Sequence, residues 1–133
     1  MKIIDIEGIG PAYAKKLNKA GIRSVEALLK KSASAKARKE IAATTGIDQT
    51  LILEWANRAD LYRIKGIGSQ YSDLLEKSGV DTVVELSKRI GSNLYKKMVE
   101  VNQAKNCVNS MPGLKHVENW IAQAKKLPRI ISY

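Results

Sequence analysis

The tripeptide Gly-Ile-Gly occurs twice in this chain, at residues 8–10 and 66–68, each time directly before a stretch with helical spacing. Two glycines let the backbone turn tightly because neither carries a Cβ atom. The N-terminus of the following helix presents unpaired amides at its positive end, where a phosphate oxygen is stabilised. The pattern therefore predicts two turns with phosphate-binding chemistry, in which Ile9 and Ile67 point into the core.

The two tripeptides belong to an internal duplication. A shift of 58 residues aligns residues 6–30 with residues 64–88, and 11 of these 25 positions are identical without a gap. Trp55 and Trp120 occupy matching places further on, after a slip of seven residues. Both lie on apolar helical stripes, which favours core packing over base stacking. We expect two repeats, at 1–63 and 64–127, that share a core or form one compact unit, and a tail at 128–133.

Capping residues divide the chain into short helices. Pro11 suits a first helical position, because an N–H there would have no helical partner. Other boundaries are predicted at the N-caps Ser24, Ser34 and Asp48, at the helix-ending glycines Gly21, Gly46 and Gly79, and at a capping box of Thr82 and Glu85. One apolar stripe joins Leu94, Met98, Val101 and Val108. No long segment alternates with period two, so we predict an all-α fold of short helices about a pseudo-two-fold axis, with no significant sheet.

The charge of the chain is strongly positive. Its 133 residues include 23 Lys and Arg against 13 Asp and Glu, which gives a formal net charge of +10. Residues 1–63 hold 12 basic and 7 acidic residues and residues 64–133 hold 11 and 6, so the excess is not a basic tail. A spread positive charge suits a polyanionic partner, nucleic acid first, and equally a solvated basic surface.

Several function classes are disfavoured. A single Cys107 excludes an intramolecular disulfide and a Cys-rich zinc site, and a single His116 argues against an imidazole metal cluster. No ATPase-type phosphate loop is present. Asp5 and Glu7 interrupt any signal-peptide core, and no apolar run is long enough to span a bilayer. We expect a cytoplasmic, soluble binding protein without catalysis, metal, cofactor, small-molecule substrate or membrane contact.

The segment GIGPAYAKKL resembles the hairpin and second helix of helix-hairpin-helix domains in DNA polymerase beta-type and repair proteins. Residues 8–30 are similar to the small N-terminal domain of archaeal and eukaryotic recombinases, and DLYRIKGIG resembles the hairpin of the RNA polymerase alpha subunit's C-terminal domain. Over residues 1–127 the chain resembles an uncharacterised bacterial domain-of-unknown-function family with tandem helix-hairpin-helix repeats. This resemblance is specific for fold and much less so for activity.

The resemblance implies sequence-independent binding of the DNA backbone, usually across the minor groove, in a setting of repair or recombination. Duplex DNA is favoured over RNA as the partner. The implicated residues supply loop amides or nearby charge: Gly8, Gly10, Ala12, Lys15, Lys16 and Lys19 in the first hairpin, and Lys65, Gly66, Gly68, Ser69 and Gln70 in the second. Glu7 beside the first loop and Asp73 at the place of Lys15 depart from this pattern. For the second hairpin a purely structural role is as well supported as phosphate contact.

Two alternatives stay open. The basic stretch 30–39, with Lys30, Lys31, Lys36, Arg38 and Lys39, suits an auxiliary DNA contact and a solvated helical connection equally. The whole scaffold also suits a protein-protein interaction module without nucleic acid. That function would expose apolar residues such as Met111, Pro112 and Leu114, and its binding would respond little to salt.

Overall fold

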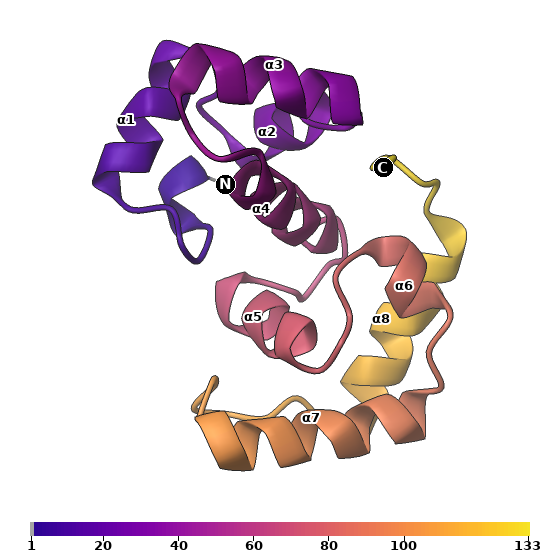
Figure 1. Ribbon diagram of the computed structural model, residues 1–133. Helices are drawn as coiled ribbons and strands as arrows, with labels where there is room; N and C mark the ends of the chain where they lie inside the picture. The colour runs from indigo at the N-terminus through magenta and orange to yellow at the C-terminus, as the bar shows by residue number, and fades with distance from the viewer. Residues whose placement is uncertain (1) are drawn as a thin grey trace. The chain divides into compact units, whose positions relative to one another are not determined.

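The computed structural model describes residues 2–133, and within them every regular element is helical (Figure 1). One isolated antiparallel bridge joins Lys2 to Ser24, and no sheet forms in the described residues. The prediction of an all-α protein is confirmed there. The chain divides into two compact units, one reaching to Asp60 and including Arg129–Tyr133, the other spanning Leu61–Pro128.

The first unit contains a short 3-10 helix and four α-helices. Their bounds are η1 Ile3–Asp5, α1 Pro11–Lys19, α2 Val25–Lys31, α3 Ala35–Thr45 and α4 Gln49–Leu61, whose last residue starts the second unit. The predicted caps form as expected, since Ser24 Oγ accepts the amide of Ala27 and Ser34 Oγ accepts that of Ala37. Local side-chain chemistry therefore fixes where these helices begin.

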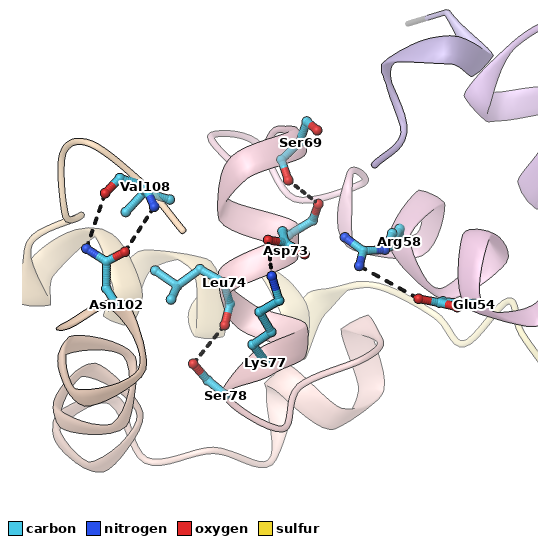
Figure 2. A network of polar contacts seen from close by, with 10 residues as sticks. Glu54, Arg58, Ser69, Asp73, Leu74, Lys77, Ser78, Asn102 and Val108 are labelled. Carbon is cyan, nitrogen blue, oxygen red and sulfur yellow. Dashed lines mark hydrogen bonds and ion pairs between the residues drawn. The ribbon is translucent and has the colours of Figure 1, made fainter. Parts of the chain in front are cut away.

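The second unit contains α5 Ser69–Lys77, α6 Val83–Ser87, α7 Gly91–Lys105 and α8 Leu114–Lys126. Helices α6 and α7 both pack against α8, and their inward faces join one hydrophobic cluster. The predicted stripe needs one correction, because α7 ends at Lys105 and Val108 lies in the loop beyond it. Val108 is nevertheless buried, because Asn102 brackets its peptide with two hydrogen bonds of 2.9 and 3.2 Å (Figure 2).

The duplication is visible in the helix bounds. A shift of 58 residues carries α1 onto α5 and the start of α2 onto the start of α6, whereas α4 and α8 coincide at a shift of 65. The slip of seven residues falls between them, where α7 has 15 residues and its counterpart α3 has 11. A longer third helix and a longer loop after it therefore contain the insertion, while the first and last helices of the unit keep their lengths.

The capping box predicted at the start of α6 forms only in half. Thr82 Oγ1 accepts the amide of Glu85 at 3.2 Å, as expected. The Glu85 carboxylate lies instead 3.1 Å from the guanidinium of Arg89, one turn along the helix. An ion pair on the helix surface thus replaces the second hydrogen bond of the box.

Arg38 corrects the interpretation of the basic stretch. We predicted a solvent-facing or DNA-contacting side chain, yet only 3% of Arg38 is exposed. Its guanidinium donates to the carbonyls of Ser32, Ala33 and Ser132, and the amide of Ser132 bonds back to Ala33. Burial lowers the pKa of Arg38, because the charged form loses water. Arg38 therefore fastens residues 129–133 to the start of α3, with Ile131 buried beside it.

No helix in the part of the chain that the structure describes is both long and apolar enough to cross a membrane.

Replacing Arg38 by Met keeps an unbranched apolar stem but removes the donors to three carbonyls. We expect the variant to lose about 3 kcal/mol of unfolding free energy, because buried carbonyls lose charge-assisted hydrogen bonds. Urea unfolding followed by circular dichroism measures the loss. The control is the exposed neighbour Lys39. Lys39→Met should change the free energy of unfolding by no more than about 0.5 kcal/mol. Equal unfolding midpoints for the two variants would contradict a stabilising role for the hydrogen bonds of Arg38.

Candidate functional site

The first Gly-Ile-Gly turn is locked onto the core by its isoleucines. The amide of Ile9 donates to the carbonyl of Ile6 at 3.1 Å, and the two side chains are 4% and 1% exposed. The second turn repeats the contact between Ile67 and Ile64 at 3.2 Å, with the same burial. The prediction that Ile9 and Ile67 point inward is confirmed.

The two glycines of each turn differ in what the fold requires of them. Gly8 has a φ of +93°, and a Cβ atom there would stand 3.4 Å from Trp55 Nε1. Gly10 has an ordinary extended backbone with φ −84°, and no heavy atom lies within 4 Å of a Cβ placed on it. The fold therefore favours glycine at position 8, whereas position 10 has room for a Cβ atom and an ordinary backbone conformation.

The second turn shows the same division more sharply. Gly66 has a φ of +102°, and its Cβ would stand 3.0 Å from Trp120 Nε1. Gly68 has φ −110° and empty space around its Cβ position. Both copies thus carry a second glycine that neither backbone strain nor packing demands.

The predicted loop amides are available for a ligand. Among residues 2–133, no hydrogen bond uses the N–H of Gly8, Gly10 or Ala12 in the first loop. The same is true in the second loop of Gly66, Gly68, Ser69 and Gln70. The first helical amides that find partners are those of Ala14 and Ser72, each bonded at 2.9 Å to the second glycine of its turn. The structure therefore gathers each predicted set of amides at the positive end of a nine-residue helix.

The three predicted lysines of the first hairpin are exposed, but they have different neighbours. Lys16 Nζ lies 6.0 Å from the centre of the Tyr13 ring. Lys15 and Lys19 instead line a hollow together with Arg23, and Lys16 is not part of that lining. Arg23 was missed as a candidate. The signal that could have found it is the difference in charge between the repeats, since the matching position in the second repeat is the acidic Asp81.

The second hairpin differs in charge. Lys65 is exposed, yet its peptide is held on both sides by Gln123, which accepts from the amide at 2.9 Å and donates to the carbonyl at 3.1 Å. Asp73, at the place of Lys15, forms an ion pair of 2.9 Å with Lys77 (Figure 2). The second loop therefore offers the same amides with much less free positive charge near them.

Lys31 has a local structural contact that the sequence did not reveal. Its Nζ atom donates to the carbonyl of Gly21 at 3.0 Å. The equivalent Arg89 donates to the carbonyl of Gly79 at 2.7 Å. Each cation thus covers the turn that ends α1 or α5, where Gly21 and Gly79 adopt the predicted left-handed conformation with φ of +83° and +93°.

The tryptophans pack as predicted. Trp55 and Trp120 are 1% and 3% exposed, so base stacking on either ring is excluded in this conformation. Each ring meets the tyrosine that follows its own Gly-Ile-Gly turn, Tyr13 at 5.0 Å and Tyr71 at 5.3 Å between ring centres. The tryptophan therefore fastens the first hairpin of its unit to the last helix.

The loop before α8 presents little apolar surface. Pro112 is buried and Met111 is partly buried against the hydrophobic cluster, whereas Leu114 is 39% exposed. His116 is exposed, and Cys107 packs partly buried on the same cluster. No group of three or more His, Cys, Asp or Glu suited to a metal ion occurs among residues 2–133. Of the three residues that a protein-interaction surface would expose here, only Leu114 is exposed.

Over residues 2–133 the geometry defines a duplicated all-α protein with two glycine turns whose predicted amides have no hydrogen-bond partner. A family model described as "Domain of unknown function (DUF4332)" matches residues 7–127. The chain therefore belongs to this family. No match was found among curated proteins or solved structures.

The contrast between the two glycines predicts a contrast in stability. Gly8→Ala should lower the free energy of unfolding by about 1–2 kcal/mol, since an L side chain is strained at positive φ. Gly10→Ala should leave it unchanged within about 0.5 kcal/mol. The pair Gly66→Ala and Gly68→Ala should repeat the difference, and urea unfolding measures all four. Similar losses for Gly8→Ala and Gly10→Ala would show that the fold does require the second glycine.

Proposed function

We propose that this protein binds duplex DNA without sequence specificity, through phosphate contacts at its glycine turns. The observation that carries the proposal is the second glycine of each turn. Gly10 and Gly68 have ordinary backbone angles and open surroundings, so folding does not account for them. The absent Cβ atoms leave free amides accessible to a ligand that approaches the backbone closely, as a phosphate oxygen does.

We further propose that the two units are tandem helix-hairpin-helix repeats. Each unit contains the turn, the nine-residue helix after it and a left-handed glycine at the end of that helix. The turn-closing hydrogen bonds recur at equivalent positions with nearly equal lengths, 3.1 and 3.2 Å for Ile9 and Ile67. This recurrence supports the resemblance of the sequence to that superfamily and to its use in DNA repair and recombination.

The charges favour the first hairpin as the main contact. Lys15, Lys16 and Lys19 follow its loop, and all three are exposed. In the second hairpin Asp73 replaces Lys15 and the buried Leu74 replaces Lys16. Because phosphate neutralisation supplies much of non-specific DNA affinity, the first loop should contribute more of it. The proposed activity is binding without catalysis.

A titration of a fluorescein-labelled duplex of about 20 base pairs, read by anisotropy at low and at physiological salt, tests the proposal. If the protein neutralises ~4 phosphates, log K should fall with log salt at a slope near −3.6. Gly10→Val should weaken binding by about tenfold or more while the protein stays folded, because its side chain would occupy the space in front of the loop amides.

The charge variants separate the hairpin from general attraction. Lys15→Glu/Lys16→Glu should abolish binding, whereas Lys125→Glu/Lys126→Glu, with the same change of net charge on α8, should retain most of it. Equal losses of DNA affinity in the two double variants would show that the protein attracts DNA only through its overall positive charge. Absence of binding by the wild-type protein at low salt would refute DNA binding and favour the protein-interaction module.

A further inference from the structure

A hollow of about 380 Å³ lies beside α1, and Lys16 is not part of its lining. It is lined by Ile4 of η1, by Pro11, Ala14, Lys15, Asn18 and Lys19 of α1, and by Arg23. Its apolar part comes from Ile4, Pro11 and Ala14, and Ile4 is 45% exposed although it is a large aliphatic side chain. The hollow therefore combines an apolar floor with three cations, and no carboxylate belongs to its lining.

The second unit has a different chemistry at the same positions. The residues that correspond to the lining are Tyr62, Ser69, Ser72, Asp73, Glu76, Lys77 and Asp81, which bring three carboxylates and one cation. Tyr62, in place of Ile4, packs against the hydrophobic cluster, with its hydroxyl 3.4 Å from Ser72 Oγ. Because the second unit forms the same helix with these residues, the backbone does not require the basic and apolar lining of the first.

We propose that this hollow docks an acidic segment of a partner protein, with one apolar side chain on the floor and carboxylates beside Lys15, Lys19 and Arg23. Lys15 and Lys19 are four residues apart on the helix, about 6 Å along its axis, so neighbouring carboxylates of one segment can reach both. The charge of the lining complements such a segment, and the exposed Ile4 gives its apolar residue a contact.

Two other occupants fit less well. Apart from Ala14, every residue of the lining is accessible to solvent, so a small molecule would stay largely in water, whereas small-molecule sites bury most of their ligand. A DNA backbone would satisfy the three cations, but it carries no protruding aliphatic group to cover Ile4. A peptide supplies both the charge and the apolar side chain.

This site goes beyond the proposed function and overlaps with it at two residues. Lys15 and Lys19 belong to both the hollow and the lysine set that follows the first glycine turn. Gly10 and Lys16 lie outside the hollow, and Ile4 lies outside the set of DNA-contacting residues. An acidic segment in the hollow would therefore compete with duplex DNA for Lys15 and Lys19, while separate variants can remove each interaction alone.

The test uses two fluorescein-labelled nine-residue peptides, each with four glutamates on either side of a central residue. The central residue is leucine in one peptide and serine in the other, so their charges are equal. We expect the leucine peptide to bind the full chain about tenfold more tightly than the serine peptide. Partial burial of a leucine side chain stabilises a complex enough to lower its Kd by about that factor. Equal affinities for the two peptides would overturn the proposal.

Variants locate the contact. Ile4→Ser should remove the preference for leucine without weakening the serine peptide, and Arg23→Glu should weaken both peptides at least tenfold. Lys39→Glu, an exposed site on α3 outside the hollow with the same charge change, should leave the preference intact. Gly10→Val should bind the leucine peptide as the wild type does, which separates this site from DNA binding.

Two results would count against a peptide site in the hollow. Retention of the leucine preference in Ile4→Ser would place the apolar contact elsewhere on the protein. A loss of duplex affinity in Ile4→Ser equal to that in Gly10→Val would assign the hollow to nucleic acid. Circular dichroism melting of each variant shows that the loss is not due to unfolding.

Discussion

The contact between a tryptophan and a glycine turn is the constraint on which each unit depends. Gly8 can adopt its positive φ beneath Trp55 only because it has no Cβ atom, and Gly66 lies in the same way near Trp120. The tryptophan comes from the last helix of the unit and the glycine from its first turn. This one contact therefore joins the first turn of the unit to its last helix.

Local signals in the sequence predicted the helices well. Ser24, Ser34 and Asp48 each hold a backbone amide two or three residues ahead, and such bonds need only the residues next to them. The burial of Trp55 and Trp120 was predictable too, because each lies on an apolar stripe that repeats in the other copy. The exception among the local signals is Glu85, whose carboxylate pairs with Arg89 one turn along and does not complete the predicted capping box.

Contacts between distant residues could not be predicted in this way. Arg38 bonds to Ser132 across 94 positions, and Gln123 brackets the peptide of Lys65 across 58. In the sequence Arg38 was one of five cations in a basic stretch, and nothing in that stretch distinguishes a buried guanidinium from a solvated one. The candidate site was affected similarly, since the sequence did not show that Arg23 joins Lys15 and Lys19 around one hollow.

The duplication supplies a comparison that a single repeat would not. Residues common to both copies and required by packing, such as Gly8 and Gly66, are explained by the fold. Residues common to both copies but not required by packing, such as Gly10 and Gly68, need another cause, and an external ligand at the loop amides provides one. Some residues differ in charge between the copies, such as Arg23 and Asp81. They show where the two units have diverged although the helices kept matching bounds. The loop amides are thus a shared property of the two units, whereas the basic hollow belongs to the first alone.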